Sequence, residues 1–91
     1  MTDYRSIADR VLQDKNPKEY RRMSRSGELA ELLDMVQEDY DRMEGERIRA
    51  QTQDLPQDYQ KRVQAYEQAK EVAREFLIAE LVEEMSAPVG S

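Results

Sequence analysis

The sequence predicts an all-α protein, a small helical bundle of three to four helices with a long C-terminal helix. Four segments carry apolar residues at helical spacing, and residues that favour helix ends separate these segments. No part of the 91-residue chain alternates polar and apolar side chains as a strand does. We expect residues 1–85 to form a single helical domain and residues 86–91 to form a flexible tail.

The first predicted helix runs from residue 4 to near Lys15. Thr2 or Asp3 can serve as its N-cap, because both side chains carry an oxygen that accepts from a backbone N–H of the first turn. Five apolar residues keep the spacing of one helical face, and we expect them to point inward: Tyr4, Ile7, Ala8, Val11 and Leu12.

A short second helix is predicted over residues 17–25. Asn16 before Pro17 is typical of an N-cap followed by proline at the first helical position, and Glu19 completes a capping-box pattern. Tyr20 and Met23 form its inward pair. The helix should end at Gly27, because glycine readily adopts the left-handed conformation of a helix C-terminus.

Two longer helices, over residues 29–43 and 57–85, are expected to form the main antiparallel pair. The first has one apolar stripe: Leu29, Leu32, Leu33, Val36, Tyr40 and Met43. The second begins after Pro56 and has a longer stripe: Tyr59, Val63, Tyr66, Ala69, Ala73, Phe76 and Leu77. Residues 44–58 are polar and include Gly45, so we interpret them as a frayed helix end and a connector.

The chain contains no cysteine and no histidine. Without cysteine the protein can form no disulfide and has no thiolate chemistry. Without histidine it lacks the side chain that most often acts as a general base, and without both it lacks the ligands of almost every zinc site. We expect no catalytic residue, no cofactor and no metal site, and we predict that the protein is not an enzyme. No apolar run is long enough to span a bilayer and no signal-like segment begins the chain, so we expect a cytoplasmic protein without membrane contact.

Charge is distributed unevenly along the chain, which has a net charge of −6. Residues 1–25 carry a net charge of +3, whereas residues 26–91 carry −9. An acidic row lies opposite the apolar stripe of the third helix, and it consists of Glu31, Asp34, Glu38 and Asp41. This row could imitate the charges of a nucleic-acid backbone and occupy a basic groove on a partner protein. Alternatively, these four carboxylates are ordinary solvated side chains of a helix surface and bind no partner.

A basic quartet occupies one face of the second helix: Lys18, Arg21, Arg22 and Arg25. It could contact phosphates, or it could solvate a short helix and pair with neighbouring acids. A helix-turn-helix around Gly27 fails on electrostatics, because its recognition helix would bring Glu28 and Glu31 against DNA phosphates. Direct nucleic-acid binding is therefore not our first expectation.

Near the C-terminus, apolar residues surround most of the helix circumference. Such a helix is either buried in the core of its own domain or in a dimer contact, or it docks into a partner's groove. The residues of this oligomer or partner surface are Phe76, Leu77, Ile78, Leu81, Val82 and Met85.

Residues 16–43, NPKEYRRMSRSGELAELLDMVQEDYDRM, resemble small helical proteins of transposons, integrative elements and phages, including the TnpV-like group. The matching positions are Pro17, Tyr20, Ser26, Gly27, Leu29 and Leu33. The resemblance implies a mobile-element origin and an accessory role without catalytic residues.

Our first hypothesis is a non-enzymatic phage or mobile-element protein that binds and modulates, by inhibition, a host or element protein. Its acidic row would occupy a nucleic-acid-binding groove, as acidic inhibitors such as some anti-CRISPR proteins do. The alternatives are a DNA-associated accessory protein that uses the basic quartet, or a helical oligomerisation or assembly factor that forms a homodimer.

Overall fold

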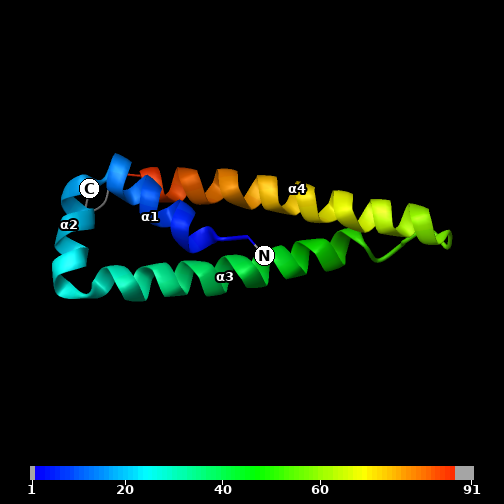
Figure 1. Ribbon diagram of the computed structural model, residues 1–91, viewed down its shortest axis with the longest axis horizontal. Coiled ribbons are helices and arrows are strands. Elements are labelled where there is room, and N and C mark those ends of the chain that lie inside the picture. Colours follow the sequence, from blue (N-terminus) through cyan, green and yellow to red (C-terminus); the bar gives the residue numbers. More distant parts are fainter. Residues whose placement is uncertain (1, 88–91) are drawn as a thin grey trace.

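The computed structural model describes residues 2–87, which form four helices joined by short connections (Figure 1). These are α1 (Tyr4–Lys15), α2 (Pro17–Ser26), α3 (Glu28–Gln51) and α4 (Tyr59–Ser86). No strand occurs among residues 2–87, so the predicted all-α bundle with a long C-terminal helix is confirmed. Ser86, expected in the tail, is the last residue of α4, and residues 88–91 of that tail lie outside the described residues.

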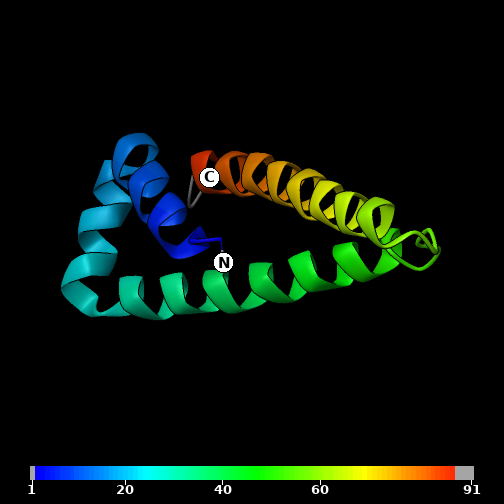
Figure 2. The same ribbon diagram turned by 45° about the vertical axis from the view of Figure 1, so that its right-hand side comes forward.

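The molecule is an elongated antiparallel pair of long helices, with two short helices at one end. Its extents are 53 × 19 × 18 Å, and α3 and α4 run side by side along the long axis. Figure 2 shows α1 between α3 and α4 and α2 across the end of the bundle. We call this the closed end. Residues 45–72, where α3 and α4 continue without α1, form a two-helix arm.

Two of the predicted helix ends are confirmed. Asp3 caps α1, because its Oδ1 accepts from the backbone N–H of Ser6 (3.0 Å) and its Oδ2 from the Ser6 hydroxyl (2.7 Å). Gly27 has φ +87° between α2 and α3, and its N–H donates to the carbonyl of Met23 (3.1 Å).

The predicted capping box at Asn16 is wrong. The Asn16 side chain makes no capping hydrogen bond to α2. Its Nδ2 donates instead to the carbonyls of Met85 (2.7 Å) and Ala87 (3.2 Å), which belong to the last turn and C-cap of α4. Asn16 therefore ties the C-terminus of α4 to the corner between α1 and α2.

Helix α3 is longer than predicted, because it continues to Gln51. Residues 44–51 contain no proline, and their good helix formers outweigh the cost of about 1 kcal/mol for Gly45. The Thr52 hydroxyl donates to the carbonyl of Ile48 (2.7 Å) where the helix ends. The connector is therefore only residues 52–58, and Asp58 rather than Pro56 caps the N-terminus of α4, since its Oδ1 accepts from the backbone N–H of Gln60 (2.9 Å).

The hydrophobic core lies at the closed end. Its buried cluster takes residues from all four helices: Tyr4, Ala8, Leu12, Met23, Leu33, Val36, Tyr40, Leu77, Leu81 and Met85. In the arm, the buried apolar residue is the small Ala69, whereas Tyr59, Val63 and Tyr66 of the predicted inward stripe are exposed. The closed end therefore carries most of the burial that stabilises the fold.

Candidate functional site

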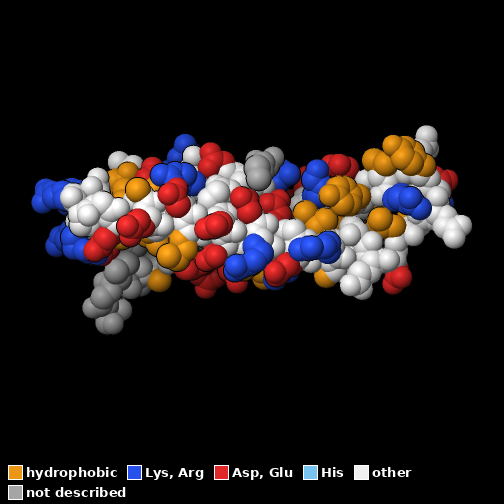
Figure 3. Space-filling model, turned by 90° about the horizontal axis from the view of Figure 1, so that it is seen from below, with side chains coloured by type: hydrophobic (Ala, Val, Ile, Leu, Met, Phe, Trp, Pro, Cys, Tyr) orange, Lys and Arg blue, Asp and Glu red, His pale blue; other side chains and the backbone are white. Residues whose placement is uncertain are grey.

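The acidic row lies on the side of α3 that faces away from the core, because Leu33, Val36 and Tyr40 occupy the buried side. Glu31, Asp34 and Glu38 are exposed, and Asp41 is half-buried. Figure 3 views the molecule from the α3 side and shows carboxylates along it, with basic side chains between them. The row is therefore accessible, but its field is interrupted by cations.

Two members of the row take part in the contact between α1 and α3, Asp34 directly and Asp41 through Gln37. Asp34 forms an ion pair with Arg5 of α1, and the Arg5 backbone N–H donates to Gln37 Oε1 (2.9 Å). Gln37 Nε2 donates in turn to Asp41 Oδ1 (2.9 Å) and to the carbonyl of Thr2 (3.0 Å). Asp34 and Asp41 therefore belong to a network that joins two helices, and their charges are not freely available to a partner.

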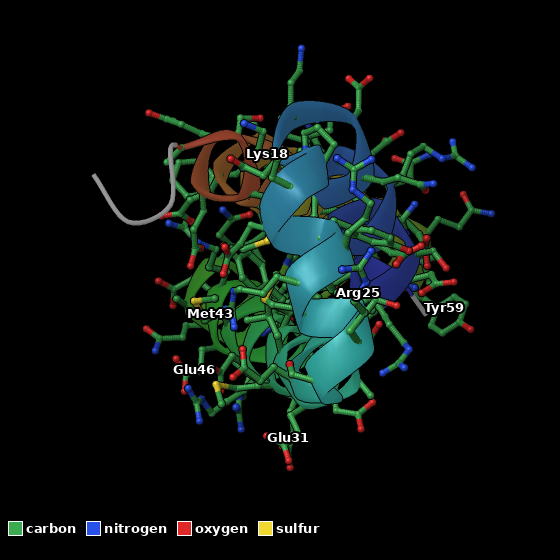
Figure 4. The ribbon with its side chains drawn as sticks, turned by 90° about the vertical axis from the view of Figure 1, so that its left-hand side faces the viewer. Lys18, Arg25, Glu31, Met43, Glu46 and Tyr59 are labelled. Atoms are coloured by element: carbon green, nitrogen blue, oxygen red, sulfur yellow. The ribbon has the colours of Figure 1, made fainter. Side chains whose placement is uncertain are left out.

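The other two members are free, and a third carboxylate extends their line. Glu31, Glu38 and Glu46 are exposed, and within residues 2–87 no Lys or Arg nitrogen lies within 4.0 Å of their carboxylates. They occur at steps of two helical turns, so they cover about 22 Å of α3. Figure 4, viewed along the molecule from the α2 end, shows Glu31 and Glu46 pointing outward.

Glu46 was not predicted as part of this surface, because the third helix was expected to end near residue 43, whereas α3 continues to Gln51. A count of good helix formers over residues 44–51 would have extended the helix and revealed this residue. One DNA strand carries a phosphate about every 3.4 Å of helix axis, so the three free carboxylates are sparser than the charges of a duplex. They can pair with a few basic side chains of a groove rather than replace a whole duplex.

The basic quartet lies together on the outer face of α2, opposite the buried Met23. Its four side chains and Ser26 line one open depression at the closed end, and Figure 4 shows Lys18 and Arg25 on this surface. Arg22 is neutralised, because it pairs with Glu19 and with Glu28 (2.9 Å). These two carboxylates raise the pKa of Arg22, and Arg22 lowers the pKa of Glu19.

The remaining three cations of the quartet have no carboxylate within 4.0 Å in the described part of the chain. Lys18, Arg21 and Arg25 fall within two helical turns, about 10 Å. Three free positive charges are thus twice as concentrated as the three free carboxylates of α3. The site is compact enough to bind one or two phosphate groups.

The C-terminal apolar group divides between core and surface. Leu77, Leu81 and Met85 are buried within the chain, so they belong to the core and are not available to a partner. Ile78 is half-buried and packs against that core. Phe76 and Val82 are 48% and 38% exposed, and the Arg47 guanidinium lies 3.7 Å from the Phe76 ring centroid. Burial therefore restricts an oligomer or partner surface on this segment to its exposed members.

Comparison of the chain with protein-family models, curated proteins and solved structures gave no match. Among residues 2–87, no group of three or more acidic side chains is arranged to hold a metal ion. Over the same residues, no helix is both long and apolar enough to cross a membrane.

Proposed function

We propose that the protein is a non-catalytic accessory factor of a phage or other mobile element that binds a partner protein and inhibits it. The resemblance of residues 16–43 to small transposon and phage proteins supports the origin. The carboxylates of Glu31, Glu38 and Glu46 support the contact, because they lie on the outer side of one helix and, among residues 2–87, no Lys or Arg nitrogen lies within 4.0 Å of them. The partner is then a protein with a basic groove for nucleic acid.

The rigidity of α3 supports this proposal. The side of α3 opposite Glu31 and Glu38 is buried in the core, and the Arg5–Asp34 ion pair and the Gln37 hydrogen bonds fix α1 against this part of the helix. A pre-ordered row loses little conformational entropy when it binds, so more of its interaction energy appears as affinity. Its charges also accelerate encounter with a basic partner.

The decisive experiment compares two triple substitutions that remove the same charge. Glu31→Gln/Glu38→Gln/Glu46→Gln neutralises the row on α3, and the control Glu71→Gln/Glu75→Gln/Glu83→Gln neutralises three exposed glutamates of α4. Tagged protein is used to isolate partners from host lysate, and duplex DNA is added as competitor. We expect the control to retain a nucleic-acid-binding partner, the α3 variant to lose it by about tenfold or more, and DNA to displace it.

Equal retention by the two variants would contradict the acidic contact. A partner that is unaffected by competing DNA would contradict the groove. Loss of the partner in both variants would show that net charge alone determines binding, which would also exclude a specific row.

A second function is favoured by the basic quartet, namely weak binding of the α2 surface to nucleic-acid phosphates. The observation is that Lys18, Arg21 and Arg25 lie within two turns of one helix and that none of them has a carboxylate within 4.0 Å among residues 2–87. Each phosphate contact contributes about 0.9 to the slope of log affinity against log salt concentration, so three contacts predict a slope near −2.7.

Fluorescence anisotropy with a labelled DNA duplex at low salt tests this function. Lys18→Gln/Arg21→Gln/Arg25→Gln should abolish the salt-dependent binding, whereas Arg49→Gln/Lys61→Gln/Arg74→Gln, which removes three exposed cations outside α2, should leave most of it. An unchanged salt slope in the α2 variant would exclude the phosphate site.

A further inference from the structure

One apolar face of α4 is covered at the closed end and bare in the arm. Tyr59 and Val63 lie five full helical turns before Leu77 and Leu81, so the members of each pair point in the same direction. Leu77 and Leu81 are fully buried in the cluster that includes Tyr4, Ala8 and Leu12 of α1. Tyr59 is 75% exposed and Val63 is 42% exposed, although they belong to the same face.

The length of α1 explains this difference. Its 12 residues cover about 18 Å, whereas the 28 residues of α4 cover about 42 Å. More than half of the face on α4 therefore has no helix above it. Tyr66 is 43% exposed on the same face, which completes an apolar stripe at positions i, i+4 and i+7. Hydrophobic side chains gather over the arm at the right of Figure 3.

We propose that a second copy of the chain covers this stripe, with the two arms packed antiparallel as a four-helix arrangement. Val63 lies near the centre of the stripe, with an aromatic residue on each side. A two-fold axis near Val63 therefore places Tyr59 of each copy beside Tyr66 of the other, and aromatic pairs of this kind stabilise an interface.

The charge of the arm permits this pairing. Residues 45–72 contain five acids and five bases, so the arm is neutral although the chain has a net charge of −6. Two arms can approach each other without the repulsion that acts between the rest of the chains. Lys70 lies close to the Tyr66 ring (5.6 Å to its centroid), and the antiparallel register brings it near residues 54–58 of the other copy, where Asp54 and Asp58 supply opposite charge.

The buried area sets the strength of the dimer. The arm face is about 21 Å long over residues 59–72 and about as wide as the 19 Å molecule, which gives roughly 800 Å² in total for two copies. This area is below that of standard stable interfaces and fits a weak, transient dimer, so we expect a dissociation constant in the upper micromolar range.

Sedimentation velocity over a concentration series tests the proposal. Wild-type protein should change from monomer to dimer between about 1 and 500 µM. Val63→Glu should raise the dissociation constant about tenfold or more, with an unchanged circular dichroism spectrum. The control Met35→Glu alters a 57% exposed residue of α3 outside the arm and should leave dimerisation unchanged.

Cysteine cross-linking gives a second readout, because the chain has no cysteine of its own. Under mild oxidation Val63→Cys should form a disulfide-linked dimer about tenfold faster than Met35→Cys, since only residues near the two-fold axis bring their Cα atoms within about 7 Å. A strictly monomeric protein at about 500 µM, or equal cross-linking of the two variants, would overturn the proposal. Dimerisation that persists in Val63→Glu would also overturn it, because the contact would then lie elsewhere.

Discussion

Removing one hydroxyl group from each of two neighbouring tyrosines should change stability in opposite directions. Tyr4 and Tyr40 are both buried in the core, and their ring centroids are 5.3 Å apart. The Tyr40 hydroxyl donates to Glu84 Oε2 (2.6 Å). The Tyr4 hydroxyl is buried without a hydrogen-bond partner among the described residues, and the nearby Glu44 accepts instead from the Thr2 hydroxyl (3.1 Å). The same chemical change therefore removes a bond at one position and an unpaired polar group at the other.

The magnitudes follow from these surroundings. Tyr40→Phe loses a charge-assisted hydrogen bond, and Glu84 is exposed enough to be solvated afterwards, so we expect a loss of about 1.5 kcal/mol. Tyr4→Phe removes a buried, unpaired hydroxyl and should increase the free energy of unfolding by about 1 kcal/mol. For a domain of this size, the two variants should differ in Tm by about 10 °C or more.

Thermal and urea unfolding, followed by circular dichroism, measure both changes. The two variants lose the same atom from the same residue type, so each is the control for the other. If Tyr4→Phe destabilises the protein as much as Tyr40→Phe does, the Tyr4 hydroxyl has a partner in solution and the reasoning is refuted.

Three further predictions concern pH, packing and a tertiary hydrogen bond. Burial raises the pKa of Tyr4 to about 12, and burial together with the Glu84 hydrogen bond raises the pKa of Tyr40. An unfolded tyrosine ionises near pH 10, whereas the buried Tyr4 hydroxyl stays neutral up to about pH 12. The free energy of unfolding should therefore fall by about 2 kcal/mol for Tyr4 alone as pH rises from 10 through 12, and urea titrations of Tyr4→Phe should show a smaller fall. Leu81→Ala should lower the free energy of unfolding, measured by chemical denaturation, by about 3 kcal/mol. Val82→Ala, at the next and 38% exposed position, should change it by less than about 0.5 kcal/mol. Similar losses in the two variants would contradict the assignment of Leu81 to the core and Val82 to the surface. Asn16→Ala should cost about 1 kcal/mol and speed hydrogen exchange in the last turn of α4, and unchanged exchange there would show that the bonds to Met85 and Ala87 are not maintained.

Local signals in the sequence predicted most of the secondary structure. Pro17 and Gly27 define the limits of α2, and the regular apolar stripes reveal α1, α3 and α4. The end of α3 was missed although its helix formers are a local signal, whereas the error at Asn16 occurred because a distant contact determines the outcome. The Asn16 amide binds carbonyls 69 and 71 residues away, so its local capping-box pattern was misleading.

For the charged surfaces too, the position of each side chain on its helix could be predicted from local spacing, whereas its ion-pair partner could not. Helical spacing placed the basic quartet on one face of α2, and the structure has them together. Which charges are free could not be read from spacing, because Arg5 reaches Asp34 from 29 residues away. The bare face of α4, by contrast, was within reach of sequence arithmetic, since a 12-residue helix cannot cover a 28-residue one.

The closed end and the arm should differ in local stability, and dimerisation through the arm should reduce this difference. Most apolar burial is at the closed end, whereas the arm is held by small contacts around Ala69 and by the Arg47–Phe76 stacking. The arm of an isolated chain should therefore open at lower free energy than the closed end. A second copy that binds only the folded arm adds stability in proportion to the logarithm of its concentration. Hydrogen exchange of residues in α4 before Ala69 should then slow as protein concentration rises, while exchange near Leu81 stays constant. If both regions respond equally, arm pairing is not what protects the exposed stripe.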